Sequence, residues 1–198
     1  MEGDDSDPLP ANFGGTPQLG WGTTNRDQPR EAFLNLAEHH YRRVIQMLML
    51  LGADQEDAKD AAQDAFLQGW DRVSDSRWAA VVKPDAWIRK VALRCYQRPP
   101  GRARTQPLIA QGVELPDIAE FGPGHAELTE QTLWVIELLG SLPMDQRTVM
   151  ALTIDKLTCT EIAQVMDLTP QQVLDLRKRA RKALIPVLAV TGGKEDAR

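Results

Sequence analysis

The sequence has 198 residues, a hydrophobic content of 42%, a formal net charge of −5 and two cysteines. The hydrophobic content supports packed cores and the length allows one or two small domains. Cys95 and Cys159 lack the spacing of metal ligands, so no metal site is expected. The sequence has no P-loop or Gly-rich phosphate cradle, and no cofactor is expected. The chain starts without an apolar signal region, and no run approaches the ~18 apolar residues of a membrane span, so we expect a cytoplasmic protein with no membrane insertion.

Apolar residues recur at helical spacing along most of the chain, and no segment shows the pattern of a strand. Residues 1–30, rich in Gly, Pro, Asp, Asn and Thr, are predicted to form a disordered extension. A helical domain is expected over 31–104, with helices at about 31–51, at about 55–73 and from Pro84 to the Pro99-Pro100 pair. Residues 105–125, with several Gly and Pro, are predicted to be a flexible linker. A second helical domain is expected over 126–190, with helices at about 126–142, 143–155, 159–166 and 170–189, and 191–198 are expected to be a tail. The predicted fold class is therefore all-α.

The second helix carries an acidic and amide stripe. Asp57, Asp60, Gln63 and Asp64 share one exposed face, and Phe66 and Trp70 lie opposite them with a set of alanines. Carboxylates accept bidentate bonds from Arg, so such a stripe suits a basic partner helix. Taken alone, the stripe is more typical of a solvated acidic helix face.

The third helix carries a basic stripe that can hold nucleic-acid phosphates. The stripe comprises Lys90, Arg94 and Arg98, and Arg102 and Arg104 extend it past the prolines. Trp78, Trp87 and Tyr96 are candidate stacking surfaces for an unpaired base. The spacing of Trp87 also fits a core position, which is the more common role of an aromatic residue on an apolar face.

Residues 157–184 read as two short helices joined by a tight turn. Thr158 with Glu161, and Thr169 with Gln172, have the spacing of capping boxes. Pro170 stands at the first position of the second helix, where its missing N–H costs little. Two capped helices joined in this way are typical of a helix-turn-helix, whose second helix enters the DNA major groove.

The second of these helices has a buried stripe and a polar face. The predicted buried stripe is Val173, Leu176, Ala180, Leu184 and Val187. Gln pairs with adenine, Lys and Arg with guanine or phosphate, and Asp with cytosine. The candidate DNA-binding residues are Thr169, Gln171, Gln172, Asp175, Lys178, Arg179, Arg181 and Lys182. A solvated charged helix is the alternative, but the two caps, the turn and the basic cluster together favour DNA binding.

Motifs in both domains resemble the sigma-70 family, and within it the two-domain extracytoplasmic-function (ECF) group. The family pattern D-A-x-D-x-x-Q-x-x-F-x-x-x-W is matched by Asp57, Ala58, Asp60, Gln63, Phe66 and Trp70. In the third helix, Pro84, Trp87-Ile88 and Val91-Ala92 match the family's next segment. In the second domain, the region 4 signatures are matched by Leu142-Pro143 with Arg147, by Glu161-Ile162-Ala163, and by Arg179-Ala180-Arg181 with Leu184.

The resemblance implies a non-enzymatic role in transcription initiation. The helix from Asp57 to Trp70 would bind the β′ clamp helices of core RNA polymerase. The first domain would read the −10 element through Trp87 and the basic stripe. The second domain would read the −35 element and pack on the β flap, with Arg147 among its DNA-binding residues. An anti-sigma factor is a partner common in the family.

Several residues depart from the family pattern. Asp167 replaces the usual turn Gly, and Arg94 and Arg98 stand where Asn and Asp are usual. Asp175 places a carboxylate on the face that would meet DNA phosphates. Two alternatives therefore stay open: a helix-turn-helix regulator that binds DNA without polymerase, and a degenerate sigma-like protein that acts through protein contacts only.

Overall fold

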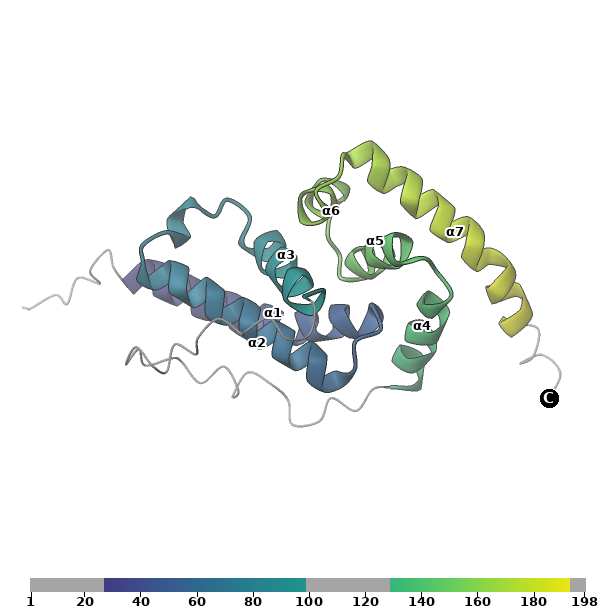
Figure 1. The fold of residues 1–198 in the computed structure, drawn as a ribbon, viewed down its shortest axis with the longest axis horizontal. Helices are drawn as coiled ribbons and strands as arrows, with labels where there is room; N and C mark the ends of the chain where they lie inside the picture. The colour runs from purple at the N-terminus through teal and green to yellow at the C-terminus, as the bar shows by residue number, and fades with distance from the viewer. Residues whose placement is uncertain (1–26, 99–128, 193–198) are drawn as a thin grey trace, which may run out of the picture.

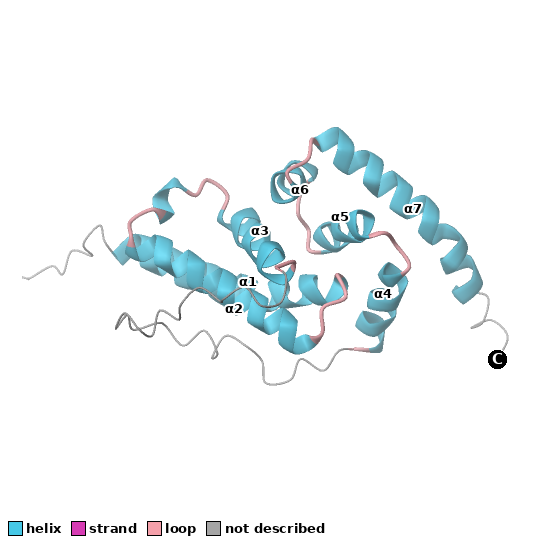
Figure 2. Ribbon diagram, in the orientation of Figure 1, coloured by secondary structure: helices cyan, strands magenta, loops and turns pink. Residues whose placement is uncertain are grey.

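The computed structural model describes residues 27–98 and 129–192, and every regular element in these two ranges is a helix (Figures 1 and 2). The predicted all-α class is thereby confirmed. Most of the predicted extension, the linker at 105–125, Arg102 and Arg104 lie outside the described residues.

The first domain contains α1 (Asp27–Leu50), α2 (Gln55–Ser74), the short 3-10 helix η1 (Trp78–Ala80) and α3 (Pro84–Tyr96). Helix α1 begins at Asp27, earlier than predicted, because Pro29 is compatible with the first turn of a helix. Gly52 lies in the connection between α1 and α2 and has φ +97°, a conformation that favours glycine. Asp54 then caps α2 by accepting a hydrogen bond of 2.7 Å from the Asp57 amide.

Aromatic rings form the centre of the first domain. Phe33 of α1 packs edge-on against Phe66 and Trp78, with ring centroids 6.1 and 5.0 Å away, and Trp70 lies 5.7 Å away. Gly69 of α2 leaves room for this ring, since a Cβ there would stand 2.5 Å from Phe33 Cε2. The alanines of α2 are buried in the same core and allow close approach of α1 and α3.

The second domain contains α4 (Glu130–Gly140), α5 (Met144–Ile154), α6 (Cys159–Met166) and α7 (Pro170–Gly192). Helix α7 packs on α5 and α6 through buried Val173, Ala180 and Leu184. Val187 was predicted to continue this stripe, but its side chain is 38% exposed. The physical reason is that the C-terminal part of α7 extends beyond α5 and α6 (Figure 1).

The two domains pack against each other. Helix α3 contacts α6, and α1 contacts both α4 and α5, so the third helix of the first domain lies beside the helix-turn-helix of the second (Figure 1). Across the described ranges, none of the helices combines the length and apolar character that a membrane span requires.

Candidate nucleic-acid interface

Both predicted capping boxes of the helix-turn-helix are present. The Thr158 amide donates to Glu161 Oε2 over 2.9 Å, and the Glu161 amide donates to Thr158 Oγ1 over 3.3 Å. Hydrogen bonds from the Thr158 amide and from the Thr158 hydroxyl to the carboxylate lower the pKa of Glu161. Thr169 and Gln172 make the same reciprocal pair, at 2.8 and 3.3 Å. Thr169 and Gln172 therefore orient the start of α7 with their side chains.

The turn between the two helices depends on Asp167. This residue has φ 56° and ψ 41°, the left-handed conformation that ends α6. Gly adopts this conformation most easily, and Asp is one of the few other residues that enter it readily. The predicted turn is thus confirmed, and its carboxylate projects from the end of α6.

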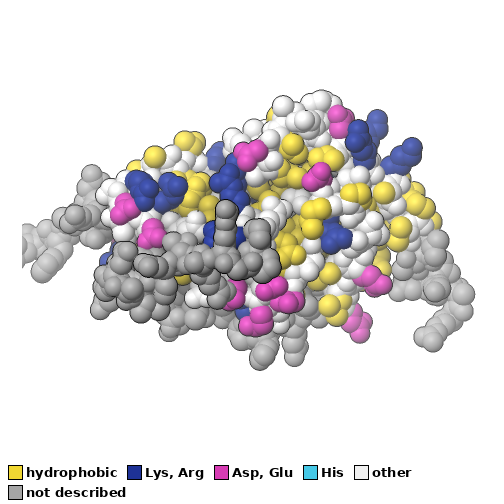
Figure 3. Space-filling model, in the orientation of Figure 1, with side chains coloured by type: hydrophobic (Ala, Val, Ile, Leu, Met, Phe, Trp, Pro, Cys, Tyr) yellow, Lys and Arg dark blue, Asp and Glu magenta, His cyan; other side chains and the backbone are white. Residues whose placement is uncertain are grey.

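The polar face of α7 is exposed and basic. A shallow groove along it is lined by Gln171, Leu174, Asp175, Arg177, Lys178, Arg181, Lys182 and Ile185. Basic side chains gather over this helix at the upper right of Figure 3. Gln171 Nε2 donates to Asp175 Oδ1 over 3.2 Å, so the acid of this face already has an amide partner.

Arg147 was expected among the DNA-binding residues, but its guanidinium is engaged within the protein. Its Nε donates to the carbonyl of Leu139 over 2.9 Å, and Nη2 donates to the carbonyls of Gly140 and Leu142. Its Nη1 donates to the carbonyl of Leu51 in the first domain over 3.2 Å. Arg147 therefore holds the α4–α5 turn and ties it to the end of α1.

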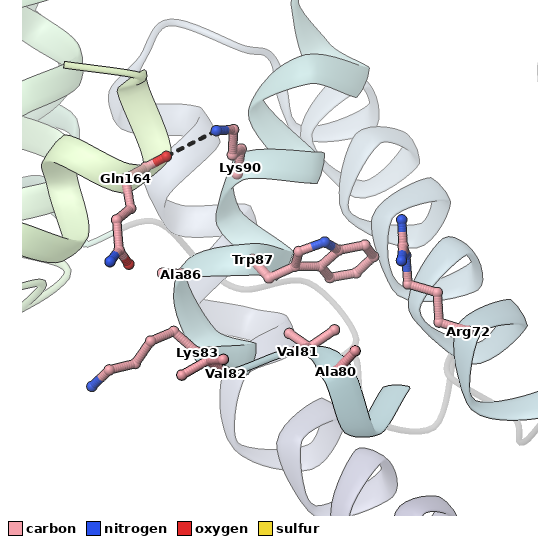
Figure 4. A pocket seen from close by; sticks show the side chains of 9 residues that line it. All are labelled: Arg72, Ala80, Val81, Val82, Lys83, Ala86, Trp87, Lys90 and Gln164. Atoms are coloured by element: carbon pink, nitrogen blue, oxygen red, sulfur yellow. Dashed lines mark hydrogen bonds between the residues drawn. The ribbon is translucent and has the colours of Figure 1, made fainter. Parts of the chain in front are cut away.

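A cavity of about 370 Å³ lies beside Trp87 of α3. Figure 4 shows its lining: Arg72, Ala80, Val81, Val82, Lys83, Ala86, Trp87, Lys90 and Gln164. Trp87 is half-buried, with Trp78 edge-on at 5.7 Å and the Arg72 guanidinium 4.9 Å from its ring centroid. The cavity thus combines an aromatic surface with three cations, a combination that suits a base and its phosphate.

The other two predicted stacking surfaces differ in exposure. Trp78 is 6% exposed and belongs to the aromatic core. Tyr96 is half-buried near the end of α3.

The basic stripe of α3 faces the second domain. Lys90 Nζ donates to the Gln164 carbonyl over 3.0 Å and also to the Asp167 carboxylate. Arg94 Nη2 stands 3.6 Å from the same carboxylate. Arg98 is half-buried at the end of the described part of this domain. Two of the predicted phosphate-binding residues are therefore paired with an acid of the helix-turn-helix.

The predicted polymerase-binding residues of α2 divide into two groups. Asp57, Asp60 and Gln63 are exposed and Asp64 is half-buried on the outer face of the helix. Phe66 and Trp70 are 0% and 3% exposed, so their side chains are part of the domain core and do not present a surface. Phe66 and Trp70 anchor α2 in the core, and the carboxylates of the helix lie on its outer face.

The interdomain ion pairs were not foreseen. Arg89 of α3 is 1% exposed, and its Nε donates to Asp155 Oδ2 at the end of α5. Arg43 of α1 donates to Asp155 Oδ1 over 3.1 Å and to the Asp155 carbonyl over 2.7 Å. One feature of the sequence indicates a buried charge in the third helix: Arg89 directly follows Ile88, a member of its apolar stripe.

Comparisons with known proteins bear on the first domain and on the overall fold. Residues 36–98 match the family model described as Sigma-70 region 2. A solved structure of CnrH in complex with the cytosolic domain of CnrY aligns with a TM-score of 0.61 at 22% identity, covering 83% of this chain and 95% of that chain. At this identity the alignment shows a shared fold. No curated protein sequence gives a significant match. Residues 36–98 are therefore similar to sigma-70 region 2, and the alignment with CnrH shows that the two chains share a fold.

Proposed function

We propose that the chain is a sigma factor of the ECF type, which binds core RNA polymerase and directs initiation at promoters with −10 and −35 elements. One observation carries the proposal: a sigma-70 region 2 domain is followed in the same chain by a doubly capped helix-turn-helix with a basic exposed face. A helix-turn-helix alone would fit many DNA-binding proteins. Its combination with region 2 favours a polymerase subunit.

The outer face of α2 is the proposed contact with core polymerase. Asp57, Asp60 and Gln63 are exposed along it and Asp64 borders them. Buried Phe66 and Trp70 anchor the helix from below. Carboxylates held on a rigid helix can each accept bonds from the Arg side chains of a partner helix, and charge complementarity then sets orientation.

The cavity beside Trp87 is the proposed site for an unpaired base of the −10 element. Trp87 offers a ring for stacking, and Lys83 and Lys90 stand at the cavity to meet the backbone. Arg98, with Arg102 and Arg104 beyond the described residues, would continue the phosphate path.

The exposed face of α7 is the proposed reader of the −35 element. Lys178, Arg179, Arg181 and Lys182 are all exposed on it, with Gln171 and Asp175 nearer its start. Lys and Arg supply phosphate affinity, and the amide and carboxylate near the N-terminal end supply base contacts. From the same resemblance, we propose that the second domain contacts the β flap.

An anti-sigma factor is a further proposed partner. CnrH, which shares the fold, was solved in complex with the cytosolic domain of CnrY. The exposed apolar side chains Leu133 and Trp134 of α4 and Ile185 and Leu188 of α7 offer area for such a protein.

Run-off transcription with purified core polymerase tests the function. The expected result is promoter-specific transcripts that depend on this protein. Specific DNA binding that is accompanied by no transcripts and no core binding would instead support a regulator that acts alone, and core binding without transcripts would support a protein that acts through protein contacts only.

A charge reversal tests the polymerase contact separately. Asp60→Lys is expected to abolish core binding in a pull-down or by gel filtration. Glu38→Lys, an exposed acid on α1, is the matched control and should bind as the parent does. Equal binding by both variants would contradict the assignment of α2.

A further inference from the structure

In the described structure α6 of the second domain lies against α3, the proposed nucleic-acid face of the first domain, and we call this the closed arrangement. Lys90 reaches both the Gln164 carbonyl and the Asp167 carboxylate, and Arg94 lies within ion-pair distance of Asp167. Gln164 of α6 also forms one wall of the cavity beside Trp87 (Figure 4). A phosphate approaching α3 would have to displace these groups.

We propose that the second domain is an internal competitor for nucleic acid: Asp167 occupies on Lys90 and Arg94 the place that a DNA phosphate would take. The assignment of these two side chains to DNA rests on the proposed function. DNA binding by α3 then requires that α6 move away from α3.

The conformation of Asp167 supports this role. At φ 56° the position favours Gly, so the backbone alone does not require an acid there. The Asp167 side chain is 69% exposed, and its carboxylate lies within ion-pair distance of Lys90 and Arg94 of α3. The hydrogen bond from Lys90 and the charges of Lys90 and Arg94 lower the pKa of Asp167, so it carries its negative charge throughout the physiological range.

A second set of contacts holds the closed arrangement in place. Arg89, 1% exposed, and Arg43 both bind Asp155 across the domain boundary. Lys83 Nζ also stands 3.4 Å from Glu161 Oε1. Exposed pairs contribute little to stability, whereas a buried charge without its partner is costly. Asp155 therefore holds the two domains together, and Asp167 competes with DNA phosphate for Lys90 and Arg94.

Zero-length cross-linking tests the closed arrangement in solution. A carbodiimide joins an amine to a carboxylate only when the two are in contact. Treatment of the full chain at low protein concentration is expected to give an intramolecular Lys90–Asp167 link, identified by peptide mass spectrometry. Excess single-stranded DNA should reduce its yield. Absence of this link from the monomer would overturn the proposal.

DNA affinity tests the competition. The probe is a fluorescein-labelled single-stranded oligonucleotide, and binding is followed by anisotropy. Asp167→Asn keeps the shape and tolerates the left-handed conformation, and it is expected to tighten binding about threefold to tenfold. Glu137→Gln, an exposed acid on α4, makes the same charge change and should alter binding less than twofold.

A double-variant comparison assigns the gain to α3. In a background with Lys90→Ala and Arg94→Ala, Asp167→Asn should give no gain beyond that of Glu137→Gln. Equal effects of the Asp167 and Glu137 variants in the parent chain, or a full gain in this background, would each overturn the proposal. These measurements use no polymerase, so a negative transcription result would reject the proposed function and leave the competition result unchanged.

Discussion

Arg89 and Asp155 form a buried ion pair that joins the two domains, with side chains 1% and 5% exposed. Arg89 Nη1 donates to the Asp85 carbonyl over 3.0 Å, and Arg89 Nη2 lies 3.3 Å from His40 Nδ1. Arg43 provides the second cation for the same carboxylate, 3.1 Å away. One carboxylate of the second domain therefore balances two guanidinium groups of the first, and the domain arrangement depends on it.

Loss of this carboxylate is expected to be costly. Asp155→Asn leaves Arg89 buried without its counter-charge, which should lower the free energy of unfolding by about 3 kcal/mol. Urea denaturation followed by far-UV circular dichroism measures the change. Glu38→Gln, on the exposed face of α1, should stay within about 0.5 kcal/mol of the parent. A stability of Asp155→Asn equal to that of this control would show that the pair does not form.

Two glycines make a matched pair for testing the core. A Cβ at Gly69 would lie 2.5 Å from Phe33 Cε2 and 3.2 Å from Ile88 Cδ1, whereas a Cβ at Gly140 would meet nothing within 4 Å. Gly69→Ala should destabilise the first domain by about 1–3 kcal/mol through overpacking. Gly140→Ala should be neutral or stabilising by up to about 1 kcal/mol. Thermal unfolding of both variants checks the contrast, and equal effects would contradict the close packing of Phe33.

Local features of this chain could be predicted because local rules determine them. The capping boxes at Thr158 and Thr169 follow from the spacing of hydroxyl and carboxylate or amide side chains. The exposed face of α7 follows from helical periodicity, and the left-handed turn at Asp167 from the need to end α6 before Pro170.

Contacts between the domains could not be predicted in the same way. Lys90 and Asp167 are 77 positions apart, and Arg43 and Asp155 are 112 apart. Periodicity assigns such residues to exposed faces and does not say which exposed faces meet. Arg147 was expected to bind DNA because of the family resemblance, and no local pattern indicates that its guanidinium bridges the carbonyls of Leu139 and Leu51.

His40 should make stability depend on pH. Burial, together with the charges of Arg89 and Arg43, lowers its pKa against the opposing effects of Asp85 and Asp155. The folded chain then binds this proton less well than the unfolded chain does. The contribution of His40 is therefore intact above its ordinary pKa of about 6.5 and is lost as pH falls below it.

A pair of histidine variants isolates this contribution. Between about pH 7.5 and pH 5.5, the free energy of unfolding measured by urea denaturation should fall more in the parent than in His40→Gln. His39→Gln is the control, since His39 is exposed on the same helix and pairs with the Asn35 carbonyl. It should keep the pH dependence of the parent. An identical pH response of His40→Gln and the parent would contradict a half-buried neutral imidazole at the domain boundary.

The salt dependence of DNA binding tests whether α7 contacts phosphates. Lys178 and Lys182 are exposed and line the groove along α7. Each phosphate neutralised by a protein cation adds about 0.9 to the slope of log affinity against log salt. Replacing both lysines by Ala should weaken binding to duplex DNA of any sequence and reduce this slope by about 2.

A lysine in the first domain serves as the control for this slope. Lys59 lies on α2, where its Nζ binds Glu56 Oε1 over 3.1 Å. Lys59→Ala removes one positive charge, as a single replacement at Lys178 does. If only α7 contacts the duplex, Lys59→Ala should leave the slope of log affinity against log salt unchanged. A slope that falls equally for Lys59→Ala and for a single replacement at Lys178 would show that net charge controls binding. An unchanged slope in the double α7 variant would remove these lysines from the interface.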